Sequence, residues 1–112
     1  MRQAVIRIAD DRVSLFVAER VRHRPRRLLL HEDRILPVAA LLDDGRMAPG
    51  IADLVADTIA RLRAVAESLE VDDFAIVLTG RVSRNRDVRE AIAIACGEPE
   101  TAWQSAEVPA SR

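Results

Sequence analysis

The sequence predicts a small α/β domain whose elements follow the order β-β-β-α-β-α, with a mixed sheet covered by helices. Three observations support this fold class: two apolar runs joined by a polar turn near the N-terminus, a long stripe of apolar residues at helical spacing, and a continuous apolar run after that stripe. The 112 residues, 49% of them hydrophobic, are enough for one domain with its own core. We therefore expect a single domain over residues 1–97 and a tail over residues 98–112.

Residues 4–21 are predicted to form a β-hairpin. The runs AVIRIA and VSLFVAERV are rich in β-branched and aromatic side chains, and the polar segment DDR between them supplies a turn. The apolar residues 28–30 and 35–36 then indicate a third strand or a strand pair, because the polar residues 31–34 interrupt them. Together these runs predict an antiparallel meander.

A long helix is predicted from Pro49, which suits the first helical position and follows a turn at Asp43–Gly45. Apolar residues recur along one face of this helix at steps of three and four: Ile51, Leu54, Val55, Ile59, Leu62, Ala66 and Leu69. Asp57 and Arg61 lie on the other side at the spacing of a surface ion pair. The pattern is typical of a helix that covers a core.

A buried parallel strand is predicted for Phe74–Thr79, because a continuous apolar run after a helix is typical of a crossover connection. Asn85 suits the N-cap of a second helix, and Gly97 suits its end. The apolar face of that helix consists of Val88, Ala91, Ile92, Ala95 and Cys96. The tail is polar apart from Trp103 and Val108, and it offers no convincing fifth strand.

Composition and charge narrow the classes of function. A net charge of -1 gives no global attraction to nucleic acid or anionic lipid, and no apolar run approaches the ~20 residues of a membrane span. The N-terminus lacks the pattern of a signal peptide. Cys96 is the only cysteine, so we expect neither an internal disulfide nor a thiolate metal cage, and a reducing, cytoplasmic setting. We also expect no bound metal or other cofactor. All 17 basic residues are arginine, a composition typical of GC-rich bacterial genomes.

The element order is that of the ribonuclease H-like fold, which forms each lobe of actin-like phosphotransferases, and three stretches resemble one family with this fold. AVIRIADDRVSLFV resembles the motif A-x-I-D-I-G-S-N-S-x-R-L-x-V, and LTGRVSRNRD takes the place of A-T-S-A-x-R-E-A-x-N. Between them, L-G-x-G-L-x-x-x-G-x-L-S aligns with Leu41, Gly45, Met47 and Pro49. Over residues 3–97 the chain thus resembles the N-terminal subdomain of the exopolyphosphatase / guanosine pentaphosphate phosphohydrolase (Ppx/GppA) family, as a degenerate, truncated relative without the second lobe.

In the first of these motifs, the departures fall on residues that the resemblance assigns to metal and phosphate. Arg7 stands where the family has an aspartate that helps to hold a metal, and Ala9 replaces a glycine that lets phosphate approach the backbone. Hydroxyl and amide donors are replaced by Asp10, Asp11 and Arg12. Two carboxylates at such a turn repel an anion unless a divalent metal intervenes.

The stretch LTGRVSRNRD, which contains Thr79 and Gly80, is degenerate in the same way. Ser83 replaces an arginine, and Arg84 replaces a glutamate that the resemblance implies is the general base. A guanidinium cannot be deprotonated in water and cannot act as a base. A two-residue gap would align Asn85 with the motif asparagine but still leaves no glutamate.

Two groups of arginines are candidates for binding a polyanion. In Arg20–Arg27 no aromatic residue is interleaved to stack on bases, so a solvated loop is the preferred interpretation. The second group, Arg81, Arg84, Arg86 and Arg89, lies where a strand ends and a helix begins, and it is the better candidate for weak polyanion binding.

Four other residues have ordinary structural interpretations. His23 and His31 lie on polar segments without a second histidine at metal-ligand spacing, so we expect surface histidines. Cys96 is interpreted as a small core residue. Trp103 either anchors the tail on the domain or docks a partner.

Two classes of function remain open. The first is a non-catalytic structural or regulatory module that pairs with itself or with a separate partner lobe; the second is a phosphohydrolase or phosphate-binding protein acting on polyphosphate or guanosine pentaphosphate-type ligands. Arg7 and Arg84, in place of carboxylates, favour the first. We expect a homodimer through the Phe74–Thr79 edge, because this strand has no charge or proline to blunt it, and coverage by the tail is the alternative.

Overall fold

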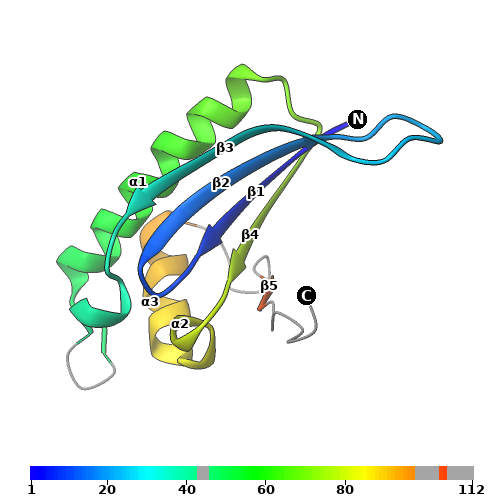
Figure 1. Cartoon of the computed structure of the whole chain (residues 1–112). Helices are drawn as coiled ribbons and strands as arrows, with labels where there is room; N and C mark the ends of the chain where they lie inside the picture. The colour runs from blue at the N-terminus through cyan, green and yellow to red at the C-terminus, as the bar shows by residue number, and fades with distance from the viewer. Residues whose placement is uncertain (43–45, 98–103, 106–112) are drawn as a thin grey trace.

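A five-stranded mixed sheet forms the centre of the molecule in a computed structural model, which describes residues 1–42, 46–97 and 104–105 (Figure 1). The spatial order is β3-β2-β1-β4-β5, and the strands are β1 (Arg2–Ile8), β2 (Arg12–Glu19), β3 (Arg27–Ile35), β4 (Asp73–Leu78) and β5 (Gln104–Ser105). The helices are the 3-10 helix η1 (Ala39–Leu41), α1 (Pro49–Ser68), α2 (Arg81–Arg84) and α3 (Arg86–Cys96). The predicted α/β class and its β-β-β-α-β-α succession are confirmed.

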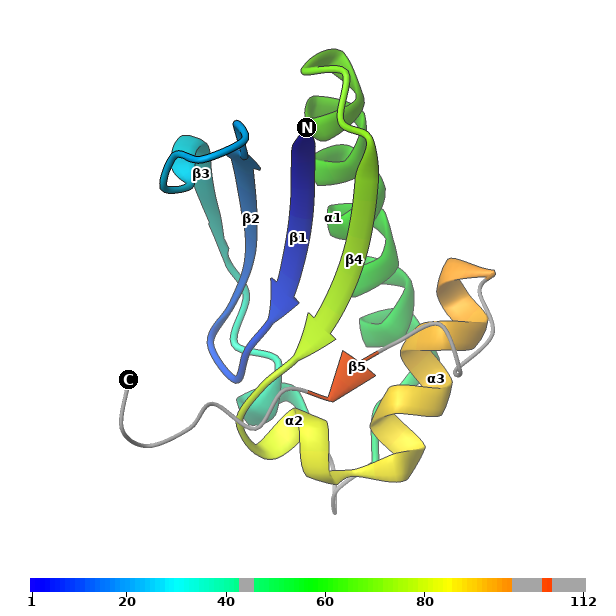
Figure 2. The ribbon, with the colours of Figure 1, turned by 90° about the vertical axis from the view of Figure 1, so that its right-hand side faces the viewer.

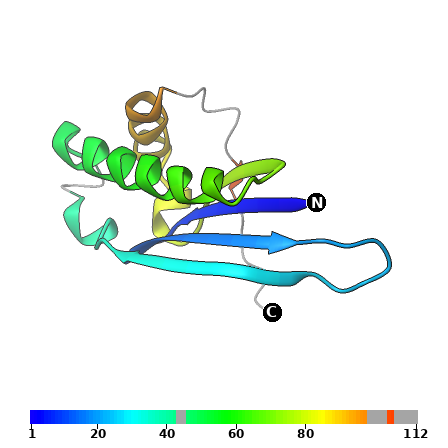
Figure 3. The same cartoon turned by 90° about the horizontal axis from the view of Figure 1, so that it is seen from above.

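The predicted hairpin and crossover are both present. β1 pairs antiparallel with β2, with Ile6 opposite Leu15, and it pairs in parallel with β4, with Ile6 opposite Ile76. The buried side chains of these strands alternate along the sequence and form one apolar face: Ala4, Ile6, Ile8, Val13, Leu15, Val17, Ile76 and Leu78. α1 and α3 both lie over one face of the sheet, as Figure 3 shows, and the described residues place no helix over the other.

β3 is one continuous strand, which decides between the two alternatives that the sequence left open. It pairs antiparallel with β2 over its whole length, with one register irregularity between Val17 and Ala18. The polar residues 31–34 stay in the strand because β3 is an edge strand and most of its side chains are exposed.

α1 begins at Pro49 as predicted, and its surface ion pair forms, with 3.2 Å between Arg61 Nη2 and Asp57 Oδ2. The predicted apolar stripe is wrong at one position, because Leu54 is 45% exposed. The stripe that reaches the core consists of Ala52, Val55, Ile59, Leu62 and Ala66. No helix among the described residues is long and apolar enough to cross a membrane.

α3 begins and ends where the sequence predicts. The Asn85 side chain accepts a hydrogen bond from the Val88 N–H at 3.2 Å, and Gly97 closes the helix with a φ of 69°. The short helix α2 before it was not predicted.

The expectation that the tail contributes no strand is wrong. Gln104 and Ser105 form β5, which pairs in parallel with Val77 and Leu78 of β4. A strand of two residues is held by backbone hydrogen bonds and needs no apolar pattern, so the sequence carries no signal for it. The predicted turn at Asp43–Gly45 and the predicted anchor Trp103 lie outside the described residues.

Candidate functional site

The β1–β2 turn, η1 and α2 meet at one end of the sheet, at the bottom of Figure 2. The turn is closed by a hydrogen bond from the Ala9 N–H to the Arg12 carbonyl at 2.9 Å. The first residue of η1 is bonded to this turn, because the N–H of Ala39 donates to the Asp10 carbonyl at 2.9 Å. The end of β4 is attached through the N–H of Thr79, which donates to the Ile8 carbonyl at 2.9 Å.

The carboxylate of Asp10 points from the turn into the loop that follows β4. Its Oδ1 accepts a hydrogen bond from the Val82 N–H at 3.2 Å, and its Oδ2 lies 3.7 Å from Nε of Arg81. Gly80 makes this approach possible, because a Cβ at that position would lie 2.8 Å from Asp10 Oδ1. Gly80 also has a φ of 71° and a ψ of -152°, a combination that only glycine adopts readily.

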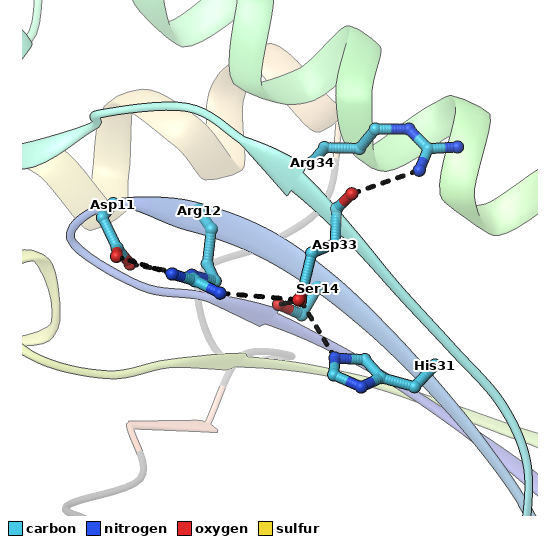
Figure 4. A network of polar contacts seen from close by, with 6 residues as sticks. All are labelled: Asp11, Arg12, Ser14, His31, Asp33 and Arg34. Carbon is cyan, nitrogen blue, oxygen red and sulfur yellow. Dashed lines mark hydrogen bonds and ion pairs between the residues drawn. The ribbon is translucent and has the colours of Figure 1, made fainter.

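A polar network continues along the other side of this turn and over β2 and β3, and it is drawn in Figure 4. Asp33 is its centre: it accepts a hydrogen bond from the Ser14 hydroxyl, its Oδ1 lies 3.0 Å from His31 Nε2, and its Oδ2 lies 3.5 Å from Arg12 Nη1. Arg12 in turn pairs with Asp11 at 3.0 Å. Asp11, Arg12, Asp33 and His31 are thus linked in sequence by hydrogen bonds and ion pairs, and the neutral Ser14 hydroxyl donates to Asp33.

The hydrogen bonds of this network shift two carboxyl pKa values. The Ser14 hydroxyl, helped by His31 and Arg12, lowers the pKa of Asp33 below its usual value of 3.8. The hydrogen bond from Arg12 likewise lowers the pKa of Asp11. Both carboxylates are therefore held in the charged form.

Although serine, histidine and aspartate meet here, they are not arranged as a nucleophile with its base. The carboxylate of Asp33 lies between the other two groups, and the Ser14 hydroxyl donates to it instead of to the imidazole of His31. Ser14 is also fully buried, so no substrate can reach its hydroxyl. The network stabilises the sheet and does not form a catalytic triad.

Comparison with solved structures gives the fold its context. A Ppx/GppA phosphatase from Aquifex aeolicus superposes with a TM-score of 0.76 over 95% of this chain and 35% of its own, at 17% sequence identity. An exopolyphosphatase from Cytophaga hutchinsonii superposes with a TM-score of 0.71 over 88% of this chain and 32% of its own, at 16% identity. The chain has the Ppx/GppA fold. It spans about a third of the length of these structures.

An exopolyphosphatase-like protein gives the same result, with a TM-score of 0.70 over 98% of this chain and 33% of its own, at 16% identity. No family model and no curated protein matches the sequence. The resemblance to Ppx/GppA inferred from the sequence is thus supported at the level of the fold, and the ribonuclease H-like class is confirmed with it.

Two positions of the first Ppx/GppA-like motif, Arg7 and Asp10, lie in different places: Arg7 is within β1, and Asp10 is in the β1–β2 turn. Arg7 lies on the face of β1 opposite the helices, where its guanidinium carbon is 5.2 Å from the centre of the Phe16 ring. Phe16 stacks on His31 with 4.4 Å between ring centres. The Nε of Arg7 is buried and has no hydrogen-bond partner among the described residues. A cation at this position cannot ligate a metal.

Two side chains at the Ppx/GppA-like positions after β4, Ser83 and Asn85, make hydrogen bonds to the backbone of the segment that contains α2 and α3. Ser83 is buried and its hydroxyl donates to the Gly80 carbonyl at 2.6 Å. Thr79 is also buried, Arg84 is exposed, and Asn85 caps α3. The structure therefore brings Asp10, Gly80 and Arg81 together but leaves Arg84 facing solvent.

Outside this end of the molecule, the remaining candidates lie apart from one another. Cys96, predicted to be a small core residue, is half-buried and packs against the core beside a cavity of about 230 Å³ between α1, α3 and β4. His23 is exposed in the β2–β3 loop, and His31 is exposed on β3. Within residues 1–42, 46–97 and 104–105, no three His, Cys, Asp or Glu side chains converge as a metal site requires.

Proposed function

We propose that this chain is a non-catalytic module built on the Ppx/GppA fold, with a structural or regulatory binding role. The observation that carries the proposal is the carboxylate of Asp10, which accepts the N–H of Val82 and lies 3.7 Å from Arg81. The Val82 N–H and the Arg81 guanidinium, which could otherwise contact a phosphate, thus contact the carboxylate of Asp10. A phosphate would have to displace that carboxylate or bind beside it against charge repulsion.

The residues at the two positions that the resemblance assigns to catalysis also support a non-catalytic module. Arg7 and Arg84 stand where the resemblance implies an aspartate for a metal and a glutamate for a general base. Neither arginine can accept a proton or coordinate a cation. Acid–base and metal-assisted hydrolysis therefore lack their protein groups at the two positions that define the family's chemistry.

Binding of a partner lobe or of a second copy remains part of the proposal. β5 covers only Val77 and Leu78, so the outer edge of β4 from Asp73 to Ile76 has no strand partner among the described residues. An unpaired edge of this kind favours pairing with another chain. Sedimentation at micromolar concentration distinguishes a monomer from a dimer.

The single cysteine is compatible with a reducing, cytoplasmic setting.

The alternative function is that of a phosphohydrolase or a phosphate-binding protein. Its support is the fold itself, since the similar structures are described as a phosphatase and an exopolyphosphatase. The present chain spans about a third of each of them. Its own arginines at 81, 84, 86 and 89 would be the place for a weakly bound anion, although Arg81 is already beside Asp10.

The decisive experiment measures phosphate release from polyphosphate by the purified chain with Mg²⁺ or Mn²⁺. We expect no release, and we expect the double variant Arg7→Asp, Arg84→Glu to remain inactive, because the chain spans only about a third of a Ppx/GppA protein. Metal-dependent release that follows the pure protein through successive columns would refute the proposal. A thermal shift with inorganic phosphate or guanosine nucleotides, without turnover, would support the phosphate-binding alternative instead.

A further inference from the structure

The loop between β2 and β3 has the densest group of arginines in the sequence. We call residues 20–27, which comprise this loop and the first residue of β3, the basic loop; it contains Arg20, Arg22, Arg24, Arg26 and Arg27. Five of the 17 basic residues thus lie within eight positions that include no acidic residue. Every one of these eight residues is exposed, and the loop projects beyond the end of the sheet in Figures 1 and 3.

None of the five guanidinium groups has an ion pair or hydrogen bond with any residue that the structure describes. The backbone is nevertheless ordered by a turn in which the Arg24 N–H donates to the Val21 carbonyl at 3.0 Å. His23 has a φ of 65° inside this turn. The charges are therefore held close together on a defined turn, although mutual repulsion raises their energy.

The five arginines are divided between the base and the tip of the basic loop. At its base, Arg20 and Arg26 line a cavity of about 190 Å³ together with the acidic residue Asp73. Arg22 and Arg24 lie further along the loop, on either side of His23, with no carboxylate on the loop itself. A ligand with many negative charges would be attracted to this tip.

The side chains of the basic loop indicate which polyanion fits. Arginine presents a planar fork of donors that matches a phosphate group in a bidentate way. The loop has no Phe, Tyr or Trp, and His23 is its only aromatic ring on which an unpaired base could stack, which favours a duplex over single strands. Val21 is its only aliphatic residue, whereas segments that insert into a membrane surface carry several large apolar side chains.

We propose that the basic loop binds the phosphate backbone of double-stranded nucleic acid without reading its sequence. All 18 acidic residues lie outside the loop, so the rest of the chain repels the duplex and contact occurs through the loop end. The site is at the opposite end of the strands from the Asp10 turn, and the inference holds whether or not that turn hydrolyses phosphate.

The test measures fluorescence anisotropy of a labelled 20-base-pair DNA duplex with the full chain at about 50 mM and about 200 mM salt. We expect weak, salt-sensitive binding, with log K falling by about 0.9 per log unit of salt for each phosphate contacted. The triple variant Arg22→Gln, Arg24→Gln, Arg26→Gln should weaken binding at the lower salt by at least about tenfold and flatten the salt dependence. The matched control, Arg84→Gln with Arg86→Gln, removes exposed arginines from the other basic group and should leave binding within about twofold.

Three results would overturn the inference: no duplex binding at the lower salt, equal binding by the triple variant, or an equal loss in the control. Binding to vesicles that contain phosphatidylserine, without binding to the duplex, would assign the loop to anionic membranes and also refute it. Because the triple variant changes only exposed side chains, an unchanged circular dichroism melt shows that it is folded.

Discussion

Charged side chains are paired at one end of the sheet and unpaired at the other. At the β1–β2 turn, Asp10 is paired with Val82 and Arg81, and Asp11 is paired with Arg12. At the basic loop, the guanidinium groups of five arginines have no ion pair or hydrogen bond with any described residue. The turn is the end at which the resemblance to Ppx/GppA implies chemistry, and the loop is an end at which it implies none.

This difference teaches that charge is a poor guide to function until its partners are known. The sequence motif at the turn draws attention to Asp10 and Asp11, yet both carboxylates serve internal contacts. The charges at the loop contribute nothing visible to the fold, and unpaired surface charges are the ones available to a ligand. This comparison supports our proposals of a structural role for the turn and a binding role for the loop.

The largest expected effect comes from Gly80. Gly80→Ala should lower the free energy of unfolding by about 1–3 kcal/mol, because alanine is strained at this backbone conformation. Its Cβ would also lie 2.8 Å from Asp10 Oδ1. Urea denaturation measures the loss.

Two other glycines separate the causes of that loss. Gly97→Ala has open space around the new Cβ at a φ of 69° and a ψ of 22°, so it reports the milder strain of the left-handed helical region without a clash. Gly50→Ala, also in open space but without a positive φ, should be neutral or stabilising. Adding Asp10→Ala to Gly80→Ala should recover the part due to the clash, and a loss that is independent of Asp10 would show that the contact is unimportant.

A smaller effect is expected on acidification. The folded pKa values of Asp11 and Asp33 lie below 3.8, so these carboxylates stabilise the fold above pH 3.8 and lose that contribution as the pH falls through their folded pKa values. Asp33→Asn should therefore flatten the decrease of unfolding free energy below about pH 4. Chemical denaturation across this range is the measurement, with Asp57→Asn, an exposed carboxylate on α1, as the control. Equal slopes in all three proteins would contradict the assignment.

The smallest effect is expected at the basic loop. The triple change of Arg22, Arg24 and Arg26 to Gln should alter the free energy of unfolding by less than about 0.5 kcal/mol, because these side chains are exposed and unpaired. It should raise that free energy if repulsion among the arginines is appreciable. A clear destabilisation, seen in the same urea titration, would mean that the loop carries structural contacts and would weaken the comparison between the two ends.

The elements that the sequence predicted are those with strong periodic signals. The apolar stripe of α1 and the run of β4 bury large surfaces, and their patterns identified both elements. Asn85 and Gly97 bounded α3 because capping is a local property. By contrast, α2 and β5 are too short to have a period, and each depends on contacts with β4 and its neighbours.

The candidate site was harder to predict because its contacts are not local. The sequence places two carboxylates on the turn and predicts repulsion of an anion, but no local pattern joins Asp10 to Val82 or Arg81. His31 and Asp33, two apart on one strand, could have been recognised as neighbours on the same face if β3 had been taken as continuous. The unpaired state of the basic loop depends on which acids lie nearby, and that is decided by the tertiary fold.

The contact of Asp10 with Val82 also has a consequence for the order of folding. Its partners are 72 residues apart in the sequence, and β4 must be placed beside β1 before they can meet. Closing so long a loop is entropically costly, so contacts of this kind tend to be absent from the folding transition state. Changes at Asp10 or Gly80 should then accelerate unfolding and leave the refolding rate nearly unchanged, which makes this turn a determinant of how long the native state lasts.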